Sequence, residues 1–119
     1  MVGTDIIEVS RIKTLIKEKG SKFLNKIYTQ NEIEYCESKG PNKYQHYAGR
    51  FAAKEAIIKA IGEKPPNLKN IQISNDNNGI PHVHIIPDPD FLSPSLHISI
   101  SHVKKYAVAF ATIEPLAHN

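Results

Sequence analysis

The amino-acid sequence predicts an α+β fold, in which helices from the first half pack on a small antiparallel sheet formed mainly by the second half. Apolar residues follow helical spacing as far as Ile61, and after residue 70 they alternate in short runs separated by turn residues. The chain has 119 residues and shows no internal repeat, so we expect a single domain over residues 1–119.

The N-terminal segment is expected to begin with a strand at residues 2–5 that joins the sheet. Gly3 allows another backbone to come close. Asp5 is expected at or just past the end of the strand, where a carboxylate is either a helix cap or a ligand. A helical apolar pattern follows and ends at Gly20.

Two short helices and a long one come next. Ser21 is a candidate cap for the first, and Thr29 with Glu32 forms a capping-box pattern for the second. Asn42 with Gln45 is a weaker cap signal for the long helix.

The long helix contains the sequence RFAAKEAIIKAIG at residues 50–62. Glu55 and Lys59 are four residues apart and share one face, so they are either a surface ion pair or part of a site. Gly62 suits the left-handed residue just past a helix end. Four alanines keep the helix thin enough for a backbone or a ligand to approach, at Ala52, Ala53, Ala56 and Ala60.

The second half is expected to form two antiparallel pairs, with strands at 71–74, 80–86, 96–101 and 106–113. Turn residues separate the first two strands, and a proline-rich loop with a short helical turn precedes the third. The last strand is apolar on both faces. A strand covered on both sides needs a second layer, which another subunit can supply.

The composition points to a cytoplasmic protein. No apolar run approaches the ~20 residues of a membrane-spanning helix, and the N-terminus lacks a basic region followed by an apolar stretch. The single cysteine, Cys36, cannot form an internal disulfide, and we expect it to be a small apolar side chain in a reducing compartment.

The net charge of +3 is unevenly distributed. Residues 11–26 hold six basic residues against one glutamate, which is a local net charge of +5. Such a stretch is either a solvated helix face or a surface that attracts an acidic partner. The basic residues are Arg11, Lys13, Lys17, Lys19, Lys22 and Lys26.

Most histidines and tyrosines carry weak signals. His82 and His84 share one face of a strand, as metal ligands can, but no third ligand lies nearby in the sequence. No local motif surrounds His46, His97 or His118. Tyr44 and Tyr47 are expected to be packing residues.

Several segments together carry a resemblance that runs from end to end: GTDIIEVSRI at 3–12, AGRFAAKEAIIKAIG at 48–62, NDNNGIPHV at 75–83, HISISH at 97–102 and YAVAFA at 106–111. They resemble the holo-acyl-carrier-protein synthase family, the small phosphopantetheinyl transferases. Two features depart from the family pattern. The Asp5 motif begins unusually close to the N-terminus, and Ile58 and Ile61 replace aromatic or small residues, which affects packing only.

The resemblance implies a reaction of fatty acid biosynthesis. A serine hydroxyl of acyl carrier protein attacks the diphosphate of coenzyme A, phosphopantetheine is transferred, and adenosine 3′,5′-bisphosphate leaves. Mg²⁺ prefers oxygen ligands completed by phosphates and waters, so Asp5 and Glu55 are the implied metal ligands. Lys59 would contact the diphosphate. The base that takes the serine proton stays open among a metal-bound water, Glu55, Asp5 and His102.

The resemblance also implies which other residues bind each substrate. The expected contacts with coenzyme A are Arg50, Lys59, Gly62 and His102, and those with acyl carrier protein are Arg11, Lys19, Lys22 and Lys26. Arg11 can alternatively reach the cofactor. The implied catalytic residues are Asp5, Glu55, Lys59 and His102.

A homotrimer with sites at the subunit interfaces is the implied assembly. Arg50 and Glu55 are five residues apart, so they point about 140° apart around a helix. Arg50 therefore either serves the site of the neighbouring subunit or pairs with an acidic neighbour in its own chain.

Two other classes of function compete with this interpretation. A small basic domain can bind nucleic acid, but only Arg11 and Arg50 are arginines, and Glu55 is placed where phosphate contacts need positive charge. The prediction is therefore that the chain binds neither nucleic acid nor a membrane. A carrier-protein-binding subunit without catalysis would keep the lysines but would not need Asp5 and Glu55 together.

Overall fold

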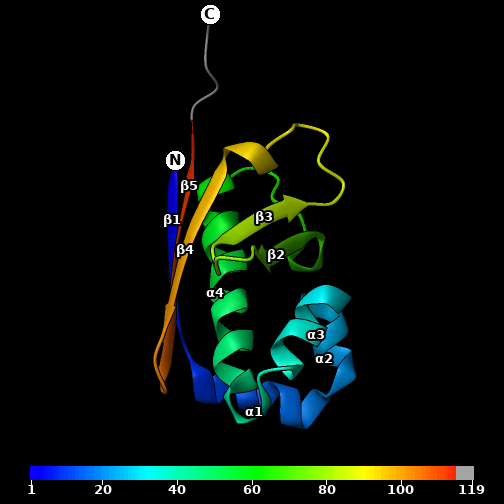
Figure 1. The fold of residues 1–119 in the computed structure, drawn as a ribbon. Helices are drawn as coiled ribbons and strands as arrows, with labels where there is room; N and C mark the ends of the chain where they lie inside the picture. Colours follow the sequence, from blue (N-terminus) through cyan, green and yellow to red (C-terminus); the bar gives the residue numbers. More distant parts are fainter. Residues whose placement is uncertain (115–119) are drawn as a thin grey trace, which may run out of the picture.

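A long central helix organises the computed structural model, which describes residues 1–114. Helix α4 (Lys43–Ile61) contacts both sheets and two of the shorter helices. Figure 1 shows the sheets along the upper part of α4 and the shorter helices near its N-terminal end. These helices are α1 (Val9–Lys19), α2 (Ser21–Ile27) and α3 (Gln30–Glu37).

The strands form two antiparallel sheets. The larger has the order β1-β5-β4, and the smaller pairs β2 with β3. Their bounds are β1 (Val2–Glu8), β2 (Ile71–Asn75), β3 (Pro81–Ile85), β4 (Leu96–His102) and β5 (Tyr106–Ile113). The predicted α+β class is confirmed. The two predicted antiparallel pairs, β2 with β3 and β4 with β5, are confirmed. The prediction of one sheet is wrong, because alternation does not show whether two pairs of strands join into one sheet.

The first strand joins the sheet as predicted but is longer than the predicted 2–5. Its pairing with β5 runs from Val2, opposite Thr112, to Glu8, opposite Tyr106. Asp5 therefore lies within the strand, opposite Ala109, and not at its end. The long partner strand β5 sets this boundary, because each further residue pair satisfies backbone hydrogen-bonding groups. A polar side chain at Asp5 does not prevent that pairing.

The predicted helix caps have mixed outcomes. Thr29 and Glu32 form the complete capping box of α3. Ser21 is not a cap, because Gly20 occupies that position before α2. Asn42 precedes α4 without a side-chain cap bond, since the chain enters α4 from a short 3₁₀ turn, Gly40–Asn42.

Two predictions about the core are confirmed. Cys36 is fully buried, and burial raises the pKa of its thiol to about 12, as expected for a packing residue. Tyr47 is also fully buried and donates from its hydroxyl to Glu37. Tyr44 is half-buried, with Lys13 and Lys43 near its ring. His118 lies outside the described residues.

β1 crosses α4 at Gly3, where the two backbones nearly touch. A Cβ built on Gly3 would overlap Ala56 O and would lie 2.7 Å from Ala60 N. Ala52, Ala53, Ala56 and Ala60 of α4 are fully buried. The predicted close approach of a backbone to this thin helix is confirmed.

Gly3→Val is expected to destabilise the fold by about 3 kcal/mol or more, because the clash is with helix backbone that cannot rotate away. Urea unfolding measures the free-energy change. Gly20→Ala is the control: no atom lies within 4 Å of the added Cβ, and only its positive φ of 57° is strained, at about 1–2 kcal/mol. Equal losses of unfolding free energy in the two variants would show that packing against α4 does not restrict the size of the side chain at residue 3.

The outer face of β1 and β5 carries exposed apolar side chains. Val2 is 63% exposed and Ile6 66%, and on β5 the exposed fractions are 48% for Tyr106, 39% for Val108 and 47% for Phe110. The inner residues of β5 are buried against α4. Such a contiguous apolar face is typical of an interaction surface.

No helix within residues 1–114 is long and apolar enough to cross a membrane.

Candidate functional site

Asp5, Glu55 and Lys59 come together where β1 passes over α4. Lys59 Nζ donates to Thr4 O at 3.0 Å and lies 3.2 Å from Asp5 Oδ1. Asp5 is only 17% exposed in its side chain, whereas Lys59 is 55% exposed. The alternative that Glu55 and Lys59 form a surface ion pair is wrong, because Lys59 pairs across the crossing with Asp5.

The charges of this cluster perturb Glu55. Burial raises the pKa of Glu55, the negative charge of Asp5 raises it further, and Lys59 opposes both effects. The cluster thus holds two carboxylates close enough to repel each other, beside an exposed ammonium group. With both carboxylates ionised, the cluster carries a net negative charge, which a cation would offset.

Gly62 ends α4 beyond Lys59. Its φ of 78° confirms the predicted positive value, and its N–H bonds to Ile58 O. A Cβ at this position would lie 3.7 Å from the Met1 side chain. The backbone of Gly62, which has no side chain, therefore lies close to Met1 at the N-terminus of the chain.

Arg50 lies on another side of α4. It is only 4% exposed, its guanidinium carbon lies 3.9 Å from the centre of the Tyr35 ring, and its Nε and Nη2 atoms are buried without a hydrogen-bond partner in the described part of the chain. No carboxylate within residues 1–114 pairs with it, so the predicted alternative of an ion pair in its own chain is wrong.

His102 lies near Arg50. Both line a cavity of about 170 Å³, together with Tyr35, His46, Asn75 and other residues. His102 Nδ1 donates to Gln45 Oε1 at 3.1 Å, because a carbonyl oxygen can only accept. Buried donors beside an imidazole suit a phosphate-sized anion.

Sequence reasoning missed His46 and Tyr35. The His46 ring packs edge-on against both Tyr35 and His102. Burial lowers the pKa of His46 to about 4, with help from the charges of His102, Lys39 and Arg50. His46 is therefore neutral at physiological pH. No motif marks either residue, but the helical position of His46, four before Arg50, places both on one face.

The structure thus separates the predicted site residues into two groups. Asp5, Glu55 and Lys59 lie at the crossing of β1 and α4, whereas Arg50 and His102 line the cavity beside α3. The expected angle between Arg50 and Glu55 around the helix accounts for this division.

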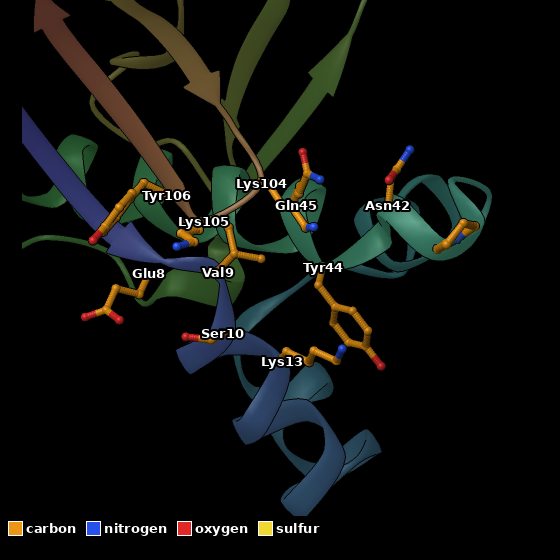
Figure 2. Close-up of a pocket in the computed structure, with 11 residues that line it drawn as sticks. Glu8, Val9, Ser10, Lys13, Asn42, Tyr44, Gln45, Lys104, Lys105 and Tyr106 are labelled. Carbon is orange, nitrogen blue, oxygen red and sulfur yellow. The ribbon is translucent and has the colours of Figure 1, made fainter.

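Arg11 borders the first group. It lines a hollow of about 270 Å³ with Asp5, Phe51 and Tyr106. A neighbouring hollow of about 440 Å³ shares Glu8 and Tyr106 with it and extends to the β4–β5 turn. Figure 2 shows this second hollow, with Lys13 beside Tyr44 and with Gln45 near Lys104 and Lys105.

The remaining predicted partner-binding lysines surround one surface hollow. Lys19 at the end of α1 and two lysines of α2, Lys22 and Lys26, line a space of about 520 Å³. Leu15, Phe23 and Ile27 also line it, together with Glu18. The hollow therefore combines three basic and three apolar side chains with one acidic side chain.

A buried ion pair was also missed. Lys54 Nζ lies 2.6 Å from Glu32 Oε1, and neither side chain is exposed. Lys54 also donates to three backbone carbonyls, at Ile27, Leu68 and Ile71. The sequence signal for this pair was the position of Lys54 among the alanines of the helix. A lysine on that buried face cannot reach solvent and needs a buried partner.

No group of three or more histidine, cysteine, aspartate or glutamate side chains within residues 1–114 is arranged to hold a metal ion. His82 instead lies 3.0 Å from Asp76 in the β2–β3 hairpin. The pair Asp5 and Glu55 can contribute two oxygen ligands, and other ligands would come from substrate and water.

The family model of the 4′-phosphopantetheinyl transferase superfamily matches residues 1–111. The chain is 47% identical to the holo-[acyl-carrier-protein] synthase of Ruminiclostridium cellulolyticum, over 95% of this chain and 90% of the relative. It is 49% identical to that of Thermodesulfovibrio yellowstonii, over 94% and 96%.

Solved structures agree with these relatives. The Helicobacter pylori holo-[acyl-carrier-protein] synthase in complex with coenzyme A superposes with a TM-score of 0.83 at 30% identity, covering 96% of this chain and 100% of the other. A Bacillus anthracis synthase in complex with CoA (3′,5′-ADP) has a TM-score of 0.79 at 36% identity, covering 94% and 93%. The predicted family is therefore confirmed: this chain belongs to the 4′-phosphopantetheinyl transferase superfamily.

Proposed function

We propose that this protein is a holo-[acyl-carrier-protein] synthase, which transfers 4′-phosphopantetheine from coenzyme A to a serine of apo acyl carrier protein. The observation that carries the proposal is the meeting of Asp5, Glu55 and Lys59 in a chain of this superfamily. We assign the activity to one domain over residues 1–119, acting in cytoplasmic fatty acid biosynthesis.

The reaction forms one phosphorus–oxygen bond and breaks another. The serine oxygen bonds to the phosphorus that carries pantetheine, the bond from that phosphorus to the bridging oxygen breaks, and adenosine 3′,5′-bisphosphate leaves. The serine proton passes to a base. Because the diphosphate is anionic, attack requires that its charge be neutralised. Lys59 supports this step with an exposed ammonium group beside Asp5.

Asp5 and Glu55 would hold Mg²⁺. The fit is good because both donors are oxygens. Burial and then the charge of Asp5 raise the pKa of Glu55, and a divalent cation would relieve the repulsion between the two carboxylates. When bound, Mg²⁺ supplies further neutralisation of the diphosphate. Two protein carboxylates, with phosphates and waters, are a common ligand set for this ion.

Arg50 and His102 would bind the phosphates of coenzyme A in the site of a neighbouring subunit. This assignment follows from the position of Arg50 on another side of α4 from the Asp5 cluster and from the unpartnered donors of Arg50. His102 is included because it lines the same cavity as Arg50. The exposed apolar face of β1 and β5 supports a subunit interface. The proposed assembly is a homotrimer, in which each interface joins two different surfaces.

Acyl carrier protein would bind beside the site through Arg11 and through the hollow rimmed by Lys19, Lys22 and Lys26. Carrier proteins of this kind are acidic, and the rim is positive. Electrostatic complementarity raises the rate of encounter and selects the partner.

Reversing Lys19, Lys22 and Lys26 to Glu is expected to weaken carrier-protein binding by about tenfold or more at low salt, mainly through a slower association rate. The difference from wild type should shrink as salt rises. Surface plasmon resonance at several salt concentrations measures both effects. Coenzyme A affinity is the internal control, and an equal loss for both substrates would show that the surface is not specific to the carrier protein.

Calorimetric titration with coenzyme A, with and without Mg²⁺, tests the proposal against its alternatives. A synthase should bind coenzyme A more tightly with Mg²⁺, because Asp5 and Glu55 would hold the ion, which would neutralise charge on the diphosphate. A carrier-binding subunit without catalysis should not bind coenzyme A, and a nucleic-acid-binding module should not respond to Mg²⁺ in this way. Either result would overturn the proposal.

A further inference from the structure

Two contacts, one helical turn apart, join α3 to α4 through the buried residues Lys54 and Arg50 of α4. In the first, Lys54 Nζ lies 2.6 Å from Glu32 Oε1. In the second, the guanidinium carbon of Arg50 lies 3.9 Å from the centre of the Tyr35 ring. The residues are three apart on α3 and four apart on α4, so both contacts belong to the same pair of facing surfaces.

The two cations are compensated in different ways. Lys54 faces a carboxylate, and that carboxylate is fully engaged: Glu32 also accepts from the backbone N–H of Thr29 at 2.8 Å and of Ile73 at 2.9 Å. Glu32 is therefore held away from Arg50. Arg50 instead faces an aromatic ring.

An aromatic face can hold a guanidinium group without occupying any of its N–H donors. The Nε and Nη2 atoms of Arg50 accordingly have no partner in the described residues, although they are buried. Arg50 itself lines the cavity of about 170 Å³, together with His102. Tyr35 is itself fixed, because its hydroxyl accepts from Asn75 Nδ2 at 3.0 Å.

The geometry points to Tyr35 as a positioning residue for coenzyme A binding. Its ring holds the Arg50 guanidinium in place and leaves the donors of Arg50 for a phosphate. A carboxylate at the same position would pair with Arg50 and consume those donors. This inference rests on the proposed function, in which Arg50 binds a phosphate of coenzyme A.

Steady-state kinetics with coenzyme A as the varied substrate test the role. Tyr35→Leu is expected to raise the KM for coenzyme A by about fivefold to tenfold, with kcat changed less than twofold, because the lost contact orients Arg50 and not the reacting atoms. Tyr35→Phe keeps the ring and should raise KM by less than about threefold. Tyr35→Glu should raise KM as much as Arg50→Ala does.

Thermal unfolding of each variant separates this role from a structural one, since a merely destabilised protein would lose active enzyme and hence kcat. If Tyr35→Leu does not fold, Tyr35→Met replaces it, with the same expected rise in KM. An unchanged KM in the folded Leu or Met variant, while Arg50→Ala raises KM, would overturn the inference. An unchanged KM in Arg50→Ala would instead overturn the proposed role of Arg50.

Discussion

Glu55→Gln is expected to lower the rate of phosphopantetheine transfer by at least about a hundredfold at limiting Mg²⁺. The substitution keeps the shape of the side chain and removes the charge. In the structure, the pKa of Glu55 is raised by burial and by the charge of Asp5. The Gln variant would therefore leave only one carboxylate to hold the cation that neutralises the diphosphate.

The measurement is turnover against Mg²⁺ concentration, with Glu63→Gln as control. Glu63 is an exposed residue just past the end of α4, so the same change in charge should have little effect there. High Mg²⁺ should recover part of the activity of Glu55→Gln. Unchanged turnover at limiting Mg²⁺ would remove Glu55 from the metal site.

Arg50→Ala, assayed at coenzyme A concentrations well below its raised KM, and Glu55→Ala are each expected to be nearly inactive alone and to recover activity when their subunits are mixed. Arg50 and the Asp5 cluster occupy different sides of α4 in one chain. If each site combines Glu55 of one subunit with Arg50 of its neighbour, random mixing restores both groups at about a quarter of the interfaces. Recovery to about a quarter of wild-type activity should follow.

Mixed refolding, followed by sedimentation and activity assays, tests this complementation. The matched control mixes each variant with itself. A protein that sediments as a monomer would exclude the shared site. Mixed samples that assemble normally but stay inactive would exclude it as well.

The members of the Asp5 cluster could be proposed from the sequence because each lies in a local motif of the family. Helical spacing also separates Arg50 from Glu55 correctly. Spacing does not reveal that Lys59 pairs with Asp5, however, because the two residues are far apart in sequence and meet only where β1 crosses α4.

The contacts around Arg50 depend on tertiary packing, and the sequence alone could not predict them. Tyr35 reaches Arg50 only because the capping box sets the start of α3 and the Glu32–Lys54 pair joins α3 to α4. The division of the strands into two sheets was missed for a similar reason. Alternation reports which face of a strand is buried, but it does not distinguish a continuous sheet from two separate ones.

The most direct test of the account is the mass of an apo acyl carrier protein after incubation with this protein, coenzyme A and Mg²⁺. We predict an increase equal to one phosphopantetheinyl group, located on a serine, and the release of adenosine 3′,5′-bisphosphate. The increase should be absent when Mg²⁺ is chelated. A carrier protein that binds to this protein but keeps its original mass, with coenzyme A and Mg²⁺ both present, would contradict the proposed transferase function.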